Sequence, residues 1–327
     1  MNKLTRGVLR ALFYPVFWRY VNMPGKSFKG QPGSFTSDET ELQAGLEAHI
    51  RALSETIGIR HHNHGETLST SAAYIVSAFE KLGFTPRLER FEFQGTAMHN
   101  VEIIIPGGSR ASEWVVVGAH YDTVPTTPGA DDNASGVAGM LELARRLKDT
   151  KPDRTICLVA YANEEHNGGL WENMGSYAHA RGLKERGLNV IGMISLEMLG
   201  YFDEAEGSQK YPFPFNLFYP TRGNFIGFVA NTMSADFVRQ CLATFRKTAR
   251  VPSEAVAAPE RFRDIARSDH WAFWQHGYPA FMVTNTSNFR NPHVHLMTDT
   301  IDTLNMAAMT QVMVGIEAVV TDLANPK

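Results

Sequence analysis

Several acidic residues and a histidine stand directly after apolar runs whose β-branched composition is typical of buried strands. They are His120 and Asp122 after residues 114–118, Glu164 and Glu165 after residues 155–162, and Glu197 after residues 190–196. Because the parallel strands of an open α/β sheet end at a common edge, we expect these side chains to lie close together. Histidine nitrogen and carboxylate oxygen are zinc ligands, and a thiol-free set favours a catalytic site that keeps a place for water.

A further pair of carboxylates, Asp131 and Asp132, precedes the helical pattern at residues 134–147. Taken singly, an acid at a strand end or a helix start is most often a cap or a surface group. Acids gathered at one edge would repel one another unless a cation neutralised them. The combination therefore predicts a metal centre at the carboxyl edge of the sheet.

The elements that would position these side chains alternate between strand and helix along the chain. Strand patterns occur at residues 87–93, 100–105, 114–118, 155–162, 190–196, 225–230 and 280–284, and helical patterns at 39–58, 68–82, 134–147, 175–185, 234–247 and 304–323. This alternation predicts a mostly parallel mixed sheet with helices on both faces. We therefore expect an α/β fold, a three-layer α/β/α sandwich formed as a single domain by residues 38–327.

The composition narrows the class of protein. A formal net charge of −3 over 327 residues argues against a general nucleic-acid binder. Cys157 lies in an apolar strand pattern and Cys241 in a helical one. Two cysteines cannot form a disulfide framework, so we expect two buried free thiols. His61, His62 and His64 stand among polar loop formers, with no carboxylate or cysteine beside them, and predict a solvated loop.

Residues 1–37 form a basic arm and linker that contain no acidic residue. Within residues 1–22 the apolar side chains recur at helical spacing, but Arg10, Pro15 and Arg19 leave no uncharged run long enough to span a membrane. The arm also lacks the small-residue cleavage site of a secretory signal. Two interpretations stay open: a basic amphipathic helix in a membrane surface, and an arm packed on the protein's own core. The compartment of the protein depends on the role of this arm. We expect a membrane-associated or exported protein, and the alternative is a cytoplasmic one.

Six segments of the chain, taken in order, resemble the successive motifs of one enzyme family. They are GAHYDTV, PGADDNASG, ANEE, SLEMLGYF, SDHWAFWQHGYPA and NPHVHLMTDTIDTL. The chain is similar in these motifs to the co-catalytic di-zinc aminopeptidases, peptidase family twenty-eight, from about residue 40 onward. The resemblance implies a zinc exopeptidase that releases amino-terminal residues from peptides and holds two Zn²⁺ per chain.

The same resemblance implies a role for each residue of the metal centre. His120 would bind one zinc, Asp132 would bridge both, Glu165 would be a ligand beside the free Glu164, Glu197 would complete the His120 metal, and His295 would bind the second metal. Asp131 would be a loop acid rather than a ligand. Val294 stands where the family often has a tyrosine that helps to stabilise an oxyanion, so that role is vacant or filled by another group.

Two residues beside these ligands are expected to act in catalysis. Adjacent glutamates at a strand end point to opposite sides of the backbone, so Glu165 can bind metal while Glu164 stays free as a base. Glu164 would take the proton of a metal-bridging water as it attacks the peptide carbonyl and pass it to the leaving amine. Asp122 would accept the other ring N–H of His120 and fix its tautomer.

Substrate contacts are predicted outside the metal centre. Residues 211–220 are rich in aromatic residues and proline. We expect Phe213 and Phe215 to form a wall of the side-chain pocket, and the alternative is a hydrophobic cluster under a long loop. His270 follows Asp269 in a segment that resembles the family, and it would either line the site or support it by packing.

Two other functions are compatible with this fold. A glutaminyl cyclotransferase would share the fold but use one zinc, and it would lack the Asp-Asn-x-Ser-Gly signature found at residues 132–136. A non-catalytic binding domain would be expected to lose ligands, whereas all five are present. The peptidase interpretation is therefore preferred.

Overall fold

A sheet of eight strands, in the order β1-β2-β4-β3-β5-β8-β6-β7, forms the centre of the described part of the molecule. This computed structural model describes residues 3–30, 33–165 and 169–326. The strands are β1 (Arg87–Phe93), β2 (Thr96–Ile105), β3 (Arg110–His120), β4 (Arg154–Tyr161), β5 (Asn189–Glu197), β6 (Ile226–Asn231), β7 (Ser253–Ala258) and β8 (Ala280–Thr284). The pairs β3-β4, β3-β5, β5-β8 and β6-β7 are parallel, and the other three pairs are antiparallel. The predicted mixed, mostly parallel sheet is confirmed.

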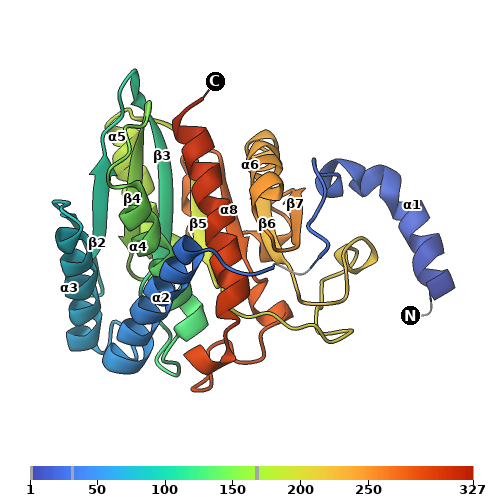
Figure 1. Cartoon of the computed structure of the whole chain (residues 1–327), viewed down its shortest axis with the longest axis horizontal. Coiled ribbons are helices and arrows are strands. Elements are labelled where there is room, and N and C mark those ends of the chain that lie inside the picture. Colours follow the sequence, from blue (N-terminus) through green and yellow to red (C-terminus); the bar gives the residue numbers. More distant parts are fainter. Residues whose placement is uncertain (1–2, 31–32, 166–168, 327) are drawn as a thin grey trace.

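Helices pack on both faces of this sheet (Figure 1). One face carries α2 (Ser37–Arg51), α3 (Gly65–Lys81), α4 (Gly136–Leu147), α6 (Ala235–Thr248) and α8 (Met306–Ala324), and the other carries α5 (Gly175–Glu185) and α7 (His270–Gln275). Each face has its own apolar core, so the elements form the three layers that the sequence predicts. Among the described residues, α8 is the one helix long and apolar enough to cross a membrane, but more than half of it is buried in the protein core.

The local sequence explains the elements nearest the predicted metal centre. The run of valines in β3 is buried on both sides, as expected for a central parallel strand, and it ends at His120. α2 begins with a capping box in which Thr36 and Glu39 accept each other's backbone N–H.

One strand and one α-helix of the described residues were not predicted from the sequence. Strand β7 is rich in alanine, which has a low strand propensity, and it is held in place by pairing with β6. Helix α7 has only six residues and is stabilised by packing of its aromatic side chains rather than by its length.

The amino-terminal helix α1 (Lys3–Val21) lies at one end of the molecule, beyond β7 (Figure 1). Its inner face packs on the aromatic segment predicted from residues 211–220. The ring of Phe17 is 8 % exposed and lies 6.0 Å from the ring of Phe215 and 5.7 Å from that of Phe218. Packing on the protein's own core, one of the two interpretations of this arm, is therefore observed for this face.

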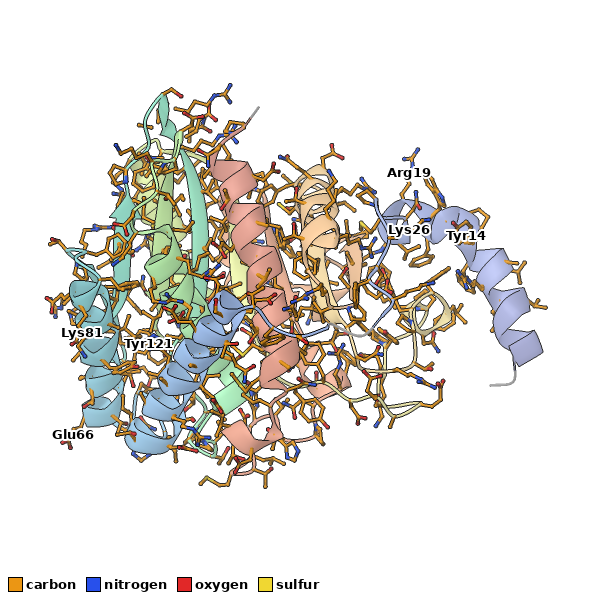
Figure 2. The ribbon with its side chains drawn as sticks, in the orientation of Figure 1. Tyr14, Arg19, Lys26, Glu66, Lys81 and Tyr121 are labelled. Carbon is orange, nitrogen blue, oxygen red and sulfur yellow. The ribbon has the colours of Figure 1, made fainter. Side chains whose placement is uncertain are left out.

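The side chains that the structure describes on the outer face of α1 are exposed. Val8, Leu12 and Val16 are 55 %, 67 % and 66 % exposed, and Trp18 is also exposed. Arg19 points away from the protein body (Figure 2). Helix α1 therefore has apolar side chains on its inner face, which is buried, and on its outer face, which is exposed.

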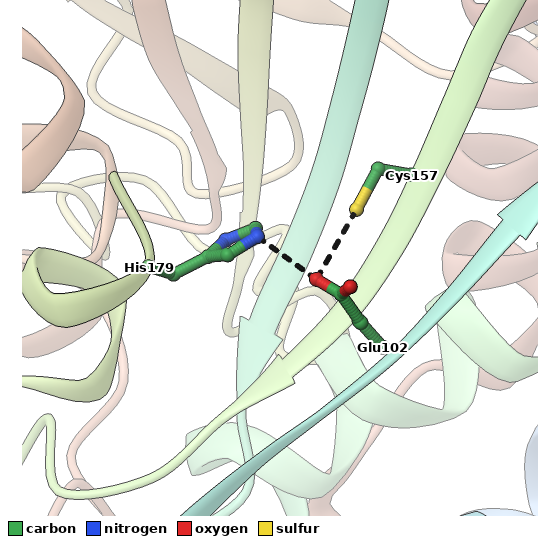
Figure 3. A group of neighbouring side chains, drawn as sticks. All are labelled: Glu102, Cys157 and His179. Carbon is green, nitrogen blue, oxygen red and sulfur yellow. Dashed lines mark hydrogen bonds and ion pairs between the residues drawn. The ribbon is translucent and has the colours of Figure 1, made fainter. Parts of the chain in front are cut away.

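A buried polar cluster lies where α5 packs on the sheet (Figure 3). The Nε2 atom of His179 lies 3.0 Å from an Oε atom of Glu102, and the Cys157 thiol lies 4.0 Å from the same oxygen. The guanidinium of Arg87 donates to the other oxygen of Glu102. Because that guanidinium balances the charge of the acid, we assign this cluster a structural role. Both cysteines are free and buried, as predicted.

Candidate metal centre and active site

Five side chains from separate parts of the chain meet at the carboxyl edge of the sheet. They form two groups, His120 with Asp132 and Glu197, and Asp132 with Glu165 and His295. Within each group the candidate ligand atoms all lie within 4.8 Å of one another, and Asp132 belongs to both groups. The structure thus brings together the five residues for which the sequence predicts metal binding.

The candidate ligand atoms point towards one another, and several of them make no hydrogen bond to other described residues. His120 Nε2 lies 3.1 Å from Glu197 Oε2 and 3.5 Å from Asp132 Oδ1. On the other side, His295 Nε2 lies 3.2 Å from Glu165 Oε1. The Nε2 atom of His120, Oδ1 of Asp132 and Oε1 of Glu165 are buried and have no hydrogen-bond partner among the described residues. Such atoms are expected to bind a cation that would satisfy them together.

The electrostatics reflect this crowding of acids. Burial and the charge of Asp132 raise the pKa of Glu165 to about 8. Burial, followed by the charges of Glu165 and Glu197, likewise raises the pKa of Glu164 well above its ordinary value. Contacts with Asp132 and Glu165 raise the pKa of His295 to about 11. A divalent cation between these groups would favour the ionised carboxylates and the neutral imidazoles.

Asp122 holds the backbone of the two adjacent glutamates. Its carboxylate oxygens each accept one backbone N–H, from Glu164 at 3.1 Å and from Glu165 at 3.1 Å. The predicted contact with the His120 ring is looser, because Nδ1 lies 3.5 Å from the carboxylate and 3.2 Å from the Asp122 carbonyl oxygen. Asp122 therefore positions the end of β4 as well as the ring.

The loop that carries Asp132 is fixed by a second buried acid. The Asp299 carboxylate accepts the backbone N–H groups of Asp131 and Asp132 at 2.9 Å and 3.1 Å. Asp131 turns away from the ligand groups and accepts hydrogen bonds from the Asn285 and Asn291 side chains. Asp131 is thus a fully buried acid that holds the loop together.

The loop at residues 60–64 differs from its prediction. Arg60 is fully buried and donates to the carbonyl oxygens of Tyr121, Leu53, Gly58, Pro128 and Gly129. These bonds draw the start of the loop into the protein, so His61 is 1 % exposed and the prediction of a solvated loop is wrong for it. His64 is exposed as predicted. A charged residue in a loop gives no sequence signal of burial, because its acceptors are distant backbone carbonyls.

Three non-glycine residues with left-handed backbone angles lie at or beside the candidate ligands. Asn163, Met198 and His295 have φ values of 64°, 53° and 61°. Asn163 precedes the glutamate pair, and Met198 follows Glu197. Such conformations cost energy and are retained where the surroundings require a fixed side-chain direction, as at functional sites.

A large cavity opens beside the five residues. It has a volume of about 580 Å³ and is lined by Glu164, Asp132 and His295 at one end and mainly by apolar and aromatic side chains elsewhere. Phe215 lines this cavity, whereas Phe213 does not and is 59 % exposed against Phe13 of α1.

His270 does not line the cavity either. It is fully buried in α7, where Nε2 lies 2.7 Å from the Ile265 carbonyl oxygen and the ring contacts Trp274. This placement agrees with the packing interpretation of His270. A contact that the sequence did not suggest is that of Ser268, whose hydroxyl donates to Glu197 at 2.8 Å.

An α/β sandwich with histidines and carboxylates gathered at the carboxyl edge of its sheet has the architecture of a metal-dependent hydrolase. The family model described as peptidase family M28 matches residues 100–320. The chain is 39 % identical over 291 residues to the protein YfbL of Escherichia coli, covering 86 % of this chain and 88 % of that protein. It therefore belongs to peptidase family M28, and the resemblance found in its motifs is confirmed.

Two further comparisons extend this relationship. Leucine aminopeptidase 1 of Arthroderma otae is 33 % identical over 244 residues, which is 69 % of this chain and 58 % of that enzyme. The chain thus spans little more than half the length of that relative. The structure of a zinc aminopeptidase from Bacillus subtilis matches 87 % of this chain and 95 % of its own with a TM-score of 0.69 at 16 % identity, and shows the shared fold.

Proposed function

We propose that this protein is a zinc-dependent aminopeptidase that hydrolyses the bond after the amino-terminal residue of a peptide. The observation that carries this proposal is the sharing of Asp132 by two groups of candidate ligands beside a large, mostly apolar cavity. Membership of a peptidase family makes peptides the substrate class. The similar leucine and zinc aminopeptidases support amino-terminal cleavage and zinc.

Two Zn²⁺ ions are proposed for the centre. His120 and Glu197 would hold one, Glu165 and His295 the other, and Asp132 would lie between them. Nitrogen and oxygen donors without a thiolate fit zinc of the catalytic kind. Zinc bound in such a site polarises the carbonyl of the substrate and lowers the pKa of water.

Glu164 is the proposed general base. It lines the cavity next to the candidate ligand Glu165 and belongs to the strand end that Asp122 fixes. Its carboxylate would accept a proton from the attacking water and return it to the leaving amine. Asp122 acts as a positioning residue, because it would touch the ligands and the base but not the substrate.

Hydrolysis of aminoacyl arylamides, with and without a chelator, tests this function. We expect turnover of at least one amino-terminal residue, loss of turnover with chelator, and recovery when zinc is returned. No hydrolysis of any aminoacyl arylamide by the zinc-loaded protein would contradict the proposal. A glutaminyl cyclotransferase, the alternative of the same fold, would instead cyclise an amino-terminal glutamine, and the second ligand group around His295 argues against it.

We also propose that residues 1–37 form an arm outside the catalytic domain of residues 38–327, and that the outer face of α1 contacts a membrane surface. This face combines Val8, Leu12 and Val16 with the basic Arg19, and α1 has no acidic residue in its sequence. Apolar and basic side chains on one helix favour an anionic lipid surface.

Sedimentation with lipid vesicles tests the membrane contact. We expect binding to vesicles of anionic lipid, with at least tenfold weaker binding by the double variant Leu12→Glu, Val16→Glu. Met233→Glu is the matched control, because Met233 is 75 % exposed and lies between β6 and α6, outside α1. Equal binding by the double variant and the control would contradict this proposal.

A further inference from the structure

The floor of the cavity is one face of the sheet. Residues on this face come from four neighbouring strands, and in β8 they alternate with core residues. They are Glu197 of β5, Met282 and Thr284 of β8, Gly227 and Val229 of β6, and Glu254 and Val256 of β7. The side chains between them, such as Val283, Leu196 and Phe281, point to the opposite core. The floor therefore extends from the metal centre to the edge strand.

A single row of paired residues crosses this floor. Glu197 pairs with Thr284, Thr284 with Gly227, and Gly227 with Glu254. Three inter-strand steps of about 4.8 Å separate the two glutamates, a span on the order of 14 Å. Thr284 is small and Gly227 has no side chain, so no long side chain rises from the middle of the row. The side chain of a bound residue can extend along this row from the metal centre towards Glu254.

The walls above the row suit an aliphatic stem. Phe215, Tyr219 and Phe262 line the cavity there, together with Val229 and Val256 on the floor. Long basic side chains bury their methylene stems against such surfaces and keep the charged end near a polar group. A purely apolar ligand would bring neither a cation nor a hydrogen-bond donor to Glu254.

The carboxylate of Glu254 is available to such a ligand. Among the described residues, none places a hydrogen bond or a close ion pair on it. The nearest cations are Arg246 and Lys29. Arg246 donates its N–H groups to the carbonyl oxygens of Pro24 and Ser253, and Lys29 is exposed. Burial raises the pKa of Glu254 in spite of these two cations, and a bound cation in direct contact with the carboxylate would offset the cost of burying its charge.

Another pair of charged residues lines the cavity, but its acid already has a cationic partner. Arg267 and Asp264 lie 3.7 Å apart and neutralise each other. Glu254 is thus the acid at the end of the floor opposite the metal centre on which no described residue places a hydrogen bond or a close ion pair.

We propose that Glu254 is a specificity-determining residue that selects substrates whose amino-terminal residue is lysine or arginine. The inference rests on the proposed aminopeptidase function. The side chain of the amino-terminal residue lies along the row from Glu197 to Glu254, and its cationic end pairs with the Glu254 carboxylate.

The test compares kcat/KM for L-lysine p-nitroanilide and L-leucine p-nitroanilide. We expect the wild-type protein to hydrolyse the lysine substrate, and the lysine-to-leucine ratio to fall at least tenfold in Glu254→Gln and further in Glu254→Lys. Asp236→Asn removes the same charge from the exposed start of α6 and keeps the wild-type ratio. Melting temperatures of the variants identify any loss of folding, and the ratio is independent of the fraction folded.

Two results would overturn the inference while leaving the aminopeptidase function intact. One is a wild-type protein that hydrolyses the leucine substrate but not the lysine substrate. The other is a ratio in both Glu254 variants within twofold of wild type. Failure to hydrolyse any aminoacyl arylamide would instead reject the proposed function together with this inference.

Discussion

At the scale of single residues, the site contains two kinds of side chain. Some would bind metal, and others fix the backbone of those candidate ligands. Asp122 and Asp299 each accept two backbone N–H groups of residues at or beside the candidate ligands. Hydrogen bonds from N–H groups to a carboxylate are stronger than those between neutral groups, so both acids fix the backbone firmly. The geometry of the centre therefore depends on carboxylates that would not themselves touch metal.

Replacing Glu164 by glutamine tests the assignment of the base. The amide has nearly the shape of the acid but cannot accept the proton, so we expect kcat to fall by roughly 10²–10⁴-fold. Zinc content and melting temperature should stay at the wild-type values, because Glu164 is not among the five candidate ligands. Steady-state kinetics and metal analysis of the same preparation provide the measurement.

The matched control for that variant is Glu172→Gln, which makes the same change at an exposed residue that does not line the cavity. It should retain wild-type kcat. Full activity of the Glu164 variant would show that another group takes the proton.

The sequence predicted the candidate ligands but not the residues that support them. Each ligand follows a strand or belongs to a motif, so a local pattern marks it. Asp299 and Arg60 act on backbone atoms distant in the sequence, and no local pattern records such a partner. Phe213 and Phe215 illustrate the same point, since both contact α1 but Phe215 alone of the two lines the cavity.

At the scale of elements, the cluster of Glu102, His179 and Arg87 ties α5 and β1 to the interior of the sheet. Burial disfavours the charge on Glu102, but its contacts with His179 and Arg87 lower its pKa to about 2. The acid is therefore ionised in the folded protein at neutral pH. A buried acid held in this way stabilises the fold through both of its partners.

Glu102→Gln should lower the free energy of unfolding by about 1–3 kcal/mol at pH 7, because it removes the charged partner of the buried His179 and of the half-exposed Arg87. The pKa of Glu102 is lowered in the folded protein from 4.5 to about 2, so its contribution is complete above pH 4.5 and is lost as the pH falls towards 2. Urea unfolding at several pH values between 7 and 3 should show the two proteins converging only below about pH 4.5.

The control for this experiment is Glu92→Gln on the neighbouring strand β1, at an exposed position. It should change stability by less than about 0.5 kcal/mol. A constant difference between wild type and Glu102→Gln over the whole pH range would contradict the account of this cluster.

The sequence predicted the elements whose apolar residues recur at regular spacing, such as α4 and α8, and those rich in β-branched residues, such as β3. Strand β7 was not, although it completes the floor of the cavity, because its alanines carry little strand preference. The position of Glu254 in the row therefore becomes evident only when the register of β6 and β7 is known.

At the scale of the whole molecule, the sheet connects three regions. The carboxyl ends of β3, β4 and β5 carry candidate ligands and the base, the strands β8, β6 and β7 form the cavity floor, and α1 packs behind the aromatic wall. Helix α1 lies at the end of the molecule nearest that wall (Figure 1). Binding of α1 to a lipid surface would therefore bring the cavity close to that surface.

The number of zinc ions that full activity requires is the most direct test of the central claim, that five side chains hold two cations through one shared carboxylate. Metal-free protein is titrated with zinc while hydrolysis of an aminoacyl arylamide and bound zinc are both measured. We predict a plateau of activity at two zinc ions per chain, and about one bound zinc with strongly reduced activity in His295→Ala. Full activity at one zinc per chain in the wild-type protein would contradict the account.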